Sequence, residues 1–356
     1  MTNKIILTFF ISQLIGCASI GPDIIQASGN DYNIAIQRTT DEQLLLNLVR
    51  LKYRDTPLFL EVNSVSSQFK LFSEAAITAN FKKQKTPENI GLSGKLNFTE
   101  QPTITYLPLH GDGFIQKLLA PISLETILLL ANSGWSVERI IRLAVQNING
   151  IPNAPTASGP TPKMAPEYID FLSVASLFRK LQNKGAFQLA YEKTEKNKQA
   201  TILFNNKQEE LVAELRKKLD LDEQNNYKLS LGQGISNDKK RIVLSTRSLL
   251  GVMYFLSHSV DVPEKDKIDG KVTITRNESG EDYDWHDLTQ DLFKINSTAE
   301  INEEIGIGTN YRGSWFYIDD SDLDSKSTFS LLTQLFSLQS GNAEGITPVL
   351  TLPIGN

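Results

Sequence analysis

The chain is poor in sulfur and imidazole chemistry. Its 356 residues include one cysteine, three histidines and three methionines. A single cysteine excludes a disulfide framework, and with so few histidines it also excludes iron–sulfur clusters and thiolate zinc sites. Excess basic charge is missing too, because 36 lysines and arginines face 41 aspartates and glutamates, for a net charge of −5. That balance argues against nucleic acid as a partner, since phosphate binding needs basic surface.

The common catalytic motifs are also missing. The sequence contains no G-x-S-x-G, G-x-x-x-x-G-K-[ST], H-E-x-x-H or G-x-G-x-x-G pattern. The usual templates for a nucleophilic serine, a phosphate loop, a zinc protease and a dinucleotide site therefore have no support. Catalysis would have to rest on carboxylates alone, as in glycoside hydrolysis. We predict no cofactor and no metal, and we consider a binding role better indicated than an enzymatic one.

The N-terminal segment is typical of a secretory signal peptide. One cation, Lys4, precedes an apolar stretch from Ile5 to Leu14. Such a stretch is too short for a permanent transmembrane helix, which needs roughly 20 apolar residues. The four residues that follow it, Leu14-Ile15-Gly16-Cys17, resemble the lipobox of bacterial lipoproteins. The resemblance implies cleavage between Gly16 and Cys17 and attachment of several acyl chains, such as palmitate, to Cys17, which is enough for stable anchoring.

The residue after the cysteine bears on the compartment. In Gram-negative lipoproteins an aspartate at this position resembles an inner-membrane retention signal, and this chain has Ala18 instead. We therefore predict a signal peptide over 1–16, a tether over 17–30, and lipid anchoring to the outer membrane with the body facing the periplasm. The alternative is a plain secreted protein in which Cys17 lies near the cleavage site by chance.

The remaining chain has the composition of a folded body, with 40% hydrophobic and 22% charged residues. Residues 38–55 repeat leucines at helical spacing, and residues 58–72, 75–81, 91–98 and 103–109 favour strands separated by turn residues. Helical patterns then follow to residue 148, with Ser136 as an expected cap. We predict an N-terminal α+β domain over 31–149, in which an antiparallel meander carries packed helices.

A proline-rich segment follows this predicted domain. Residues 150–167 contain five prolines and two glycines, which favours an extended loop. So long a stretch without regular structure indicates either a linker between domains or a functional surface loop. Beyond it, residues 168–356 alternate helical and strand patterns, ending in a helix near 331–338 and a strand over 349–352. We predict a second α+β domain there, arranged like an α/β unit.

Two acidic segments have an ordinary structural explanation beside a functional one. Residues 319–324 place aspartates as in the first half of an EF-hand loop, but Ser325 and Leu331 replace the required glycine and glutamate. Capping of the following helix explains these acids better. Six acids surround His286: Glu278, Glu281, Asp282, Asp284, Asp287 and Asp291. They could hold a cation or supply acid and base groups, but a solvated face of a helix over 283–293 explains their spacing equally.

The other two histidines are also weak candidates. His110 lies between a predicted strand and a predicted helix, where a structural hydrogen bond is the simpler interpretation. His258 ends a hydrophobic helix, where a cation is favourable at the negative end of the helix dipole.

Two stretches combine aromatic and basic residues, which are enriched at protein interfaces. One runs from Arg50 to Arg54 and the other from Tyr311 to Tyr317. Read as one strand, the second would place Tyr311, Trp315 and Tyr317 on one face and Arg312 on the other. An ordinary sheet strand would look the same. We take Tyr311, Arg312, Trp315 and Tyr317 as candidate interaction residues.

Three runs extend the likeness beyond the lipobox: EQLLLNLVRLKYRDTPLFLEV, SGPTPKMAPEY and GSWFYIDDSDLDSKSTF. They resemble a group of uncharacterised Gram-negative lipoproteins, and this resemblance implies no activity and no site residue. The resulting hypothesis is a lipid-anchored protein that acts as a structural or interaction component of a cell-envelope assembly, with an envelope protein as partner. The alternative is a carboxylate-based envelope hydrolase or a glycan-binding lipoprotein.

Overall fold

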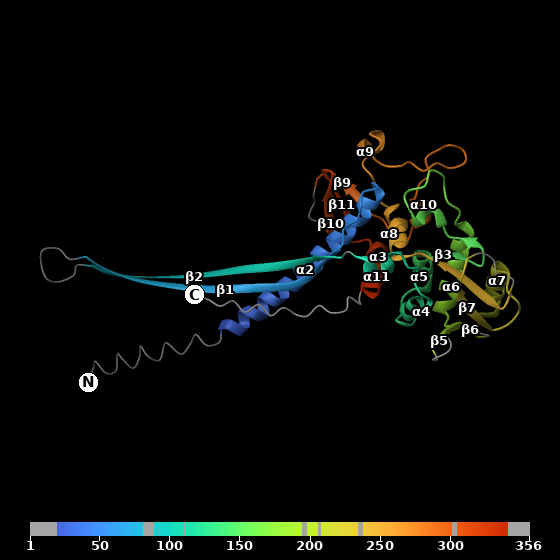
Figure 1. Cartoon of the computed structure of the whole chain (residues 1–356), viewed down its shortest axis with the longest axis horizontal. Coiled ribbons are helices and arrows are strands. Elements are labelled where there is room, and N and C mark those ends of the chain that lie inside the picture. The colour runs from blue at the N-terminus through green and yellow to red at the C-terminus, as the bar shows by residue number, and fades with distance from the viewer. Residues whose placement is uncertain are drawn as a thin grey trace. The chain divides into compact units, whose positions relative to one another are not determined.

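The computed structural model describes residues 20–80, 89–109, 111–193, 198–205, 208–233, 238–300 and 305–340. The chain divides into two compact units (Figure 1). The larger unit comprises residues 1–59 and 110–343, and the smaller unit comprises residues 60–109 and 344–356. Helices and two separate multistranded sheets make up the larger unit, so the α+β class predicted from the sequence is confirmed.

A six-stranded mixed sheet organises one part of the larger unit. Its strand order is β4 (Ile151–Pro152), β3 (Val145–Ile148), β8 (Arg241–Thr246), β7 (Asn226–Leu231), β6 (Lys198–Phe204) and β5 (Phe187–Lys193). Neighbouring strands are antiparallel except β7 and β8, which are parallel. Strand β3 precedes residues 150–167, strand β4 lies within them, and strand β8 follows them. The predicted boundary in that segment is therefore wrong, since one sheet includes both sides.

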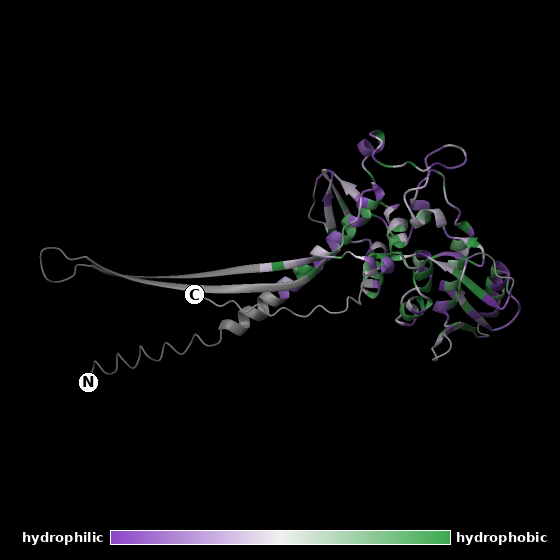
Figure 2. Ribbon diagram, viewed as in Figure 1, coloured by the Kyte–Doolittle hydropathy of each residue, from purple (hydrophilic) through white to green (hydrophobic). Residues whose placement is uncertain are grey.

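Helices pack on this sheet and on each other. They are α4 (Leu124–Asn132), α5 (Val137–Ala144), α6 (Ile169–Asn183) and α7 (Glu209–Leu219). Aliphatic side chains of α4 and α5, such as Ile127 and Ile140, are buried and line an apolar space shared with Ile202 and Ile242 of the sheet. Hydrophobic residues of the larger unit lie mainly within its helices and strands (Figure 2). Burial of these aliphatic side chains is the main stabilising contribution, at about 25 cal/mol per Å² of apolar surface.

Serine caps define where several helices begin. The Ser123 hydroxyl accepts a hydrogen bond from the Thr126 amide, and Ser136 does the same for Arg139, as the sequence predicted for that helix. Strand β8 continues through Thr246, and the Ser248 hydroxyl caps α8 (Leu249–Ser257) by accepting from the Gly251 amide.

The longest helix is α2 (Ile20–Lys52). It includes most of the predicted tether, because helix already begins at Ile20. Pro22 lies in the first turn, where a backbone N–H has no partner within the helix and its absence costs little. Near the other end, Leu45, Leu48 and Val49 are fully buried, and this part of α2 contacts α8 and β10 (Ile305–Tyr311).

A small antiparallel sheet has the order β10, β11 (Ser314–Asp319) and β9 (Asn296–Thr298). Strands β10 and β11 form a hairpin in which Tyr311 pairs with Ser314. The two turn residues, Arg312 and Gly313, have φ of 52° and 84°. Two positive φ values are what a two-residue turn matching the twist of the strands requires. The continuous strand predicted over 311–317 is therefore interrupted by a turn.

Residues 150–167 form an ordered loop that includes the short 3₁₀ helix η2 (Pro155–Ser158). Buried side chains from other segments hold it. The Arg247 guanidinium donates to the Ser158 hydroxyl at 3.0 Å, and the Thr275 hydroxyl donates to the Pro162 carbonyl oxygen at 2.6 Å. The bond from Thr275 satisfies a backbone carbonyl in a segment that has little regular structure to do so.

The remaining helices are α3 (Asp112–Leu119), α9 (Glu264–Ile268), α10 (His286–Thr289) and α11 (Leu323–Ser340). The helix predicted over 283–293 is thus reduced to four residues, and no strand covers 272–275 in the part of the chain that the structure describes. The strand predicted over 349–352 lies outside the described residues. Among the residues that the structure describes, no helix has the length and apolar character needed to cross a membrane.

In the smaller unit, β1 (Leu60–Asn80) and β2 (Asn89–Pro108) form one antiparallel ribbon of 21 and 20 residues. Its register runs from Leu60 opposite Pro108 to Asn80 opposite Asn89, with one irregularity between Val62 and Ser64. At about 3.4 Å per residue, the ribbon is about 70 Å long. The predicted meander of four short strands is therefore a hairpin of two long ones.

Candidate functional site

The two aromatic-basic stretches meet at the end of α2. The Tyr311 hydroxyl and the Arg312 guanidinium both donate to the Asp55 carboxylate, the latter at 2.9 Å. The Tyr311 ring meets Tyr53 edge to face, with centroids 5.5 Å apart, and the Arg312 guanidinium lies 5.1 Å from the centroid of the Tyr53 ring. The hydrogen bond from Tyr311 is the main reason that the pKa of Asp55 is lowered.

A buried carboxylate continues this cluster. The Tyr53 hydroxyl donates to Asp266 at 2.6 Å, and the Lys271 ammonium donates to the other oxygen of the same carboxylate, also at 2.6 Å. The Lys271 bond, followed by the Tyr53 bond, lowers the pKa of Asp266. Burial raises the pKa of the Tyr53 hydroxyl. Tyr53, Asp55, Asp266, Lys271, Tyr311 and Arg312 therefore form one polar cluster in which every charge has an opposite partner.

The four candidate interaction residues do not share one surface. Tyr311 and Arg312 both bind Asp55 in the cluster at the end of α2. On β11, Phe316 and Ile318 are buried, whereas Trp315 and Tyr317 alternate with them and are half-buried. Because alternate strand residues lie on opposite faces, Trp315 and Tyr317 belong to the face of the small sheet turned away from its core.

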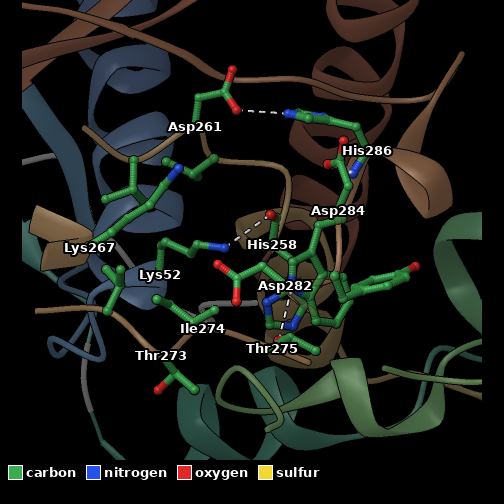
Figure 3. Close-up of a pocket in the computed structure, with 15 residues that line it drawn as sticks. Lys52, His258, Asp261, Lys267, Thr273, Ile274, Thr275, Asp282, Asp284 and His286 are labelled. Atoms are coloured by element: carbon green, nitrogen blue, oxygen red, sulfur yellow. Dashed lines mark hydrogen bonds and ion pairs between the residues drawn. The ribbon is translucent and has the colours of Figure 1, made fainter. Parts of the chain in front are cut away.

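A polar cavity lies beside the C-terminal end of α2 (Figure 3). Its volume is about 140 Å³, which is room for several waters or one small organic molecule. The side chains that line it come from α2, from the segments after α8 and α9, and from the approach to α10: Lys52, His258, Val260, Asp261, Val262, Lys267, Val272, Thr273, Ile274, Thr275, Asp282, Tyr283, Asp284, Trp285 and His286.

Lys52 is the most unusual member of this set. It is buried, with 6% of its surface exposed, and its ammonium donates to the His258 carbonyl oxygen at 3.1 Å. Burial lowers the pKa of Lys52 to about 8; the charge of Asp261 acts against this shift, and Lys267 adds to it. Among the described residues no carboxylate lies within ion-pair distance of this ammonium.

His258 forms one wall together with Trp285. The two rings are stacked with centroids 4.2 Å apart. The ring nitrogen Nε2 lies 3.0 Å from the carbonyl oxygen of Ala157, so this nitrogen carries the proton and donates it. Burial, with a further contribution from the charge of Lys52, holds the pKa of His258 well below its usual value. The prediction that His258 is charged at the end of α8 is therefore wrong, because burial lowers its pKa more than the helix dipole raises it.

The acids that line the cavity already have partners. The Asp261 carboxylate accepts from His286 at 2.8 Å and from Lys294 at 3.3 Å. Burial acts to raise the pKa of Asp261, but these two partners together lower it. Asp284 accepts the backbone N–H of His286 at 2.9 Å. The partner of His286 is thus Asp261, which lies outside the acidic set predicted around this histidine.

Of the aspartates at 319–324, Asp322 caps α11, as the simpler interpretation predicted, and Asp319 binds an amide in the turn before it. Asp322 accepts the Ser325 amide at 3.0 Å, and Asp319 accepts the Ser321 amide at 2.8 Å. Asp324 and Asp320 pair with Arg139 and Lys326. The structure shows no group of three or more metal-binding side chains among the residues it describes. Gly16, Cys17 and His110 lie outside the described residues, so the predicted cleavage and lipidation sites stay predictions.

Sequence reasoning missed Lys52 and Asp261, although one signal for Lys52 was present. Lys52 follows Leu48 by four residues and Leu45 by seven, so it falls on the apolar face of its helix. A lysine at such a position is either a snorkelling surface residue or a buried charge. No comparable signal marks Asp261.

Comparisons with protein-family models, with curated proteins and with solved structures found no match to this chain.

Proposed function

We propose that this protein is a lipid-anchored component of a cell-envelope assembly in the outer membrane, and that the β1–β2 ribbon binds an envelope protein partner. The single observation that carries the proposal is the ribbon itself. A two-stranded hairpin is marginally stable in water unless it packs against something. Here about fifty residues are devoted to a two-stranded sheet that is joined to no third strand in the described part of the chain.

The pattern of residues along the ribbon supports a binding role. Apolar residues recur at alternate positions of both strands, and the register sets them opposite one another: Leu71 with Phe98, Ile77 with Leu92, Ala79 with Ile90. Alternate positions of a strand belong to one face. Where exposure is described, Ile104 and Tyr106 are 38% and 40% exposed. This sequence pattern predicts a largely apolar face, which is more favourable when a partner covers it.

The backbone edges of the ribbon suggest how the partner binds. A strand with an unpaired edge presents free N–H and C=O groups, and an added strand of another protein satisfies them. Main-chain pairing supplies affinity there, and the alternating residues supply specificity. We therefore propose that the partner is a protein that adds an extended segment to an edge of the ribbon. The lipobox at Cys17 supports an envelope location for this encounter.

The ribbon can be removed without a gap in the larger unit, because Val62 and Tyr106 are directly opposite each other. Deleting residues 64–105 and inserting one glycine after Asn63 leaves an Asn-Gly turn between these two residues, which suits a tight hairpin. We expect this variant to keep its folding and its membrane attachment and to lose partners in a mild-detergent pull-down. Unchanged recovery of the same partners would refute the ribbon as the binding element.

Site-specific photocrosslinking provides a second test. A photoreactive phenylalanine analogue at Ile104 should give a crosslinked adduct with an envelope protein in intact cells. The same analogue at Ala213, an exposed position of α7 in the larger unit, is the matched control. Adducts of equal yield at both positions would argue against a partner specific to the ribbon.

The anchor is tested separately. Cys17→Ser should abolish fatty-acid labelling and release the protein from the membrane fraction, because this is the only cysteine in the chain. Ala18→Asp should leave labelling intact and shift the protein toward the inner membrane. Persistent labelling of Cys17→Ser would overturn the lipid anchor while leaving the ribbon proposal to its own tests.

A further inference from the structure

We infer that the cavity beside α2 binds a small molecule with a single carboxylate and an apolar body, and that Lys52 is the residue that binds the carboxylate. The inference rests on which charges in the cavity are already neutralised, on the burial of Lys52 and on the size of the space. It is independent of the proposed role of the ribbon.

The first step concerns the hydrogen-bonding capacity of Lys52. An ammonium group has three donors. One donates to the His258 carbonyl oxygen at 3.1 Å, and the structure gives the other two no acceptor among the residues it describes. A buried charge without an ion-pair partner is costly, and an acceptor of opposite charge would offset that cost. Figure 3 shows the ammonium of Lys52 directed toward the middle of the lining residues.

The second step concerns the other charged groups. Asp261 is held by His286 and Lys294, Asp282 lies 4.0 Å from Arg276, and Lys267 pairs with Glu264 at 3.2 Å. Lys52 is therefore the one charged side chain lining the cavity that has neither an ion-pair partner nor a capping bond in the described part of the chain. A ligand must supply one negative charge to match it.

The third step limits the charge and size of the ligand. Three carboxylates, those of Asp261, Asp282 and Asp284, line the same cavity. They would repel a dianion such as phosphate more than a monocarboxylate. The volume of about 140 Å³ is below the roughly 300–1,000 Å³ of sites for drug-sized ligands, so the ligand is small.

The fourth step concerns the body of the ligand. Val260, Val272 and Ile274 line the cavity with aliphatic surface, and Trp285 and Tyr283 meet edge to face beside them, with ring centroids 5.3 Å apart. These side chains offer an apolar wall to the part of the ligand that does not carry the charge. An aliphatic or aromatic monocarboxylate satisfies both the ammonium and this wall.

Benzoate is a suitable probe, with benzamide as its neutral analogue and inorganic phosphate as the more highly charged anion. Binding to the full-length lipidated protein in detergent is measured by calorimetry at pH 7. We expect benzoate to bind at least about tenfold more tightly than benzamide, since a hydrogen bond to a charged group distinguishes them. Phosphate should bind more weakly than benzoate. Tighter binding of phosphate, or no preference for benzoate over benzamide, would overturn the inference.

Two variants locate the charge. Lys52→Met removes the ammonium and keeps the aliphatic stem, so the preference for benzoate should disappear. Lys265→Met is the matched control, because Lys265 is an exposed lysine of α9 that is not among the residues lining the cavity; it should change the preference by less than about twofold. Retention of the preference in Lys52→Met, or its loss only in Lys265→Met, would assign the binding to another residue and overturn the inference.

A pH series on the unmodified protein needs no variant. Because the pKa of Lys52 is about 8, raising the pH from 7 to 9 discharges its ammonium. Benzoate affinity should then fall about tenfold while benzamide affinity stays constant. The charged groups facing Lys52 are Asp261, Lys267, Asp282, Asp284 and His286, with neutral His258 beside it. Affinity for benzoate that does not change over this range would contradict the role of Lys52 even if Lys52→Met fails to fold.

Discussion

The imidazole of His258 stacks on the indole of Trp285, with 24° between the two planes. Its Nε2 donates to the Ala157 carbonyl oxygen in the proline-rich loop, and its Nδ1 lies 3.4 Å from the Thr161 hydroxyl in the same loop. One buried side chain at the end of α8 thus connects this loop to the cavity beside α2. Burial of the ring favours the uncharged imidazole, whose Nδ1 can accept from the Thr161 hydroxyl.

Acid should therefore destabilise the protein through His258. Its folded-state pKa lies well below the ordinary value near 6.5, so the unfolded chain takes up the proton first as the pH falls. The contribution to stability is complete above pH 6.5 and is lost below it, at up to about 1.4 kcal/mol per pH unit. Urea unfolding between pH 5 and 7.5 measures this slope. His258→Gln should reduce the slope, and an equal slope in both proteins would contradict the assignment.

Alkaline pH should have the opposite effect through Lys52. Its pKa falls from 10.5 in the unfolded chain to about 8 in the folded protein, so the unfolded chain holds the proton longer as the pH rises. Stability should increase between pH 8 and 9.5, by at most about 1.4 kcal/mol per pH unit. Chemical denaturation should show this increase in the wild type and in Lys265→Met, an exposed position of α9, but not in Lys52→Met. An increase that persists in Lys52→Met would have another origin.

Replacing Arg247 should loosen the proline-rich loop. Its guanidinium is fully buried, lies 4.2 Å from the centroid of the Phe255 ring, and donates to the Ser158 hydroxyl and to four backbone carbonyls, those of Arg142, Leu143, Val145 and Asn153. Arg247→Met removes these donors; the Arg142 and Val145 carbonyls keep a bond from Asn153, but loss of the other bonds should cost about 3 kcal/mol or more.

Two measurements check this expectation. Urea unfolding gives the loss of stability, and limited trypsin digestion should show faster cleavage after Lys163, which lies in the loop. Arg179→Met, at an exposed position of α6, is the matched control and should change stability by less than about 0.5 kcal/mol. Wild-type resistance of Lys163 to trypsin in Arg247→Met would show that other contacts hold the loop.

The bond between Tyr53 and Asp266 can be removed without changing the ring contacts. Tyr53→Phe deletes one hydroxyl and leaves the buried Asp266 carboxylate with Lys271 alone, so we expect a loss of about 1–2 kcal/mol of stability. Tyr106→Phe provides the comparison, since this side chain of the ribbon is 40% exposed. Thermal unfolding of both variants tests the difference, and equal melting temperatures would contradict it.

Local pattern predicted the helices well because their stabilising features are local. Ser136 and the apolar face of α5 lie within one short segment, and so do the leucines of α2. The ribbon was harder to predict. Gly91 and Pro102 favour turns, yet both lie within β2. A two-stranded ribbon has two unpaired edges, and a strand tolerates proline where the missing N–H would face such an edge.

The polar cluster and the cavity could not be predicted, because their partners are far apart in the chain. Tyr311 and Asp55 are 256 residues apart, and Tyr53 and Asp266 are 213 apart. Composition identified the right residue types in both aromatic-basic stretches, but nothing local indicated that the stretches contact each other. Burial of Lys52 likewise depends on the segments around 258 and 285, which pack over the end of α2.

For a chain anchored as proposed, helix α2 also limits how far the folded core can lie from the bilayer. It begins three residues after Cys17, and the first of its leucines to enter the core is Leu44. The helical segment between Ile20 and Leu44 rises about 1.5 Å per residue, or about 36 Å in total. In such a chain this helix is a rigid spacer between the acyl chains and the core, in place of the flexible tether that the sequence predicted.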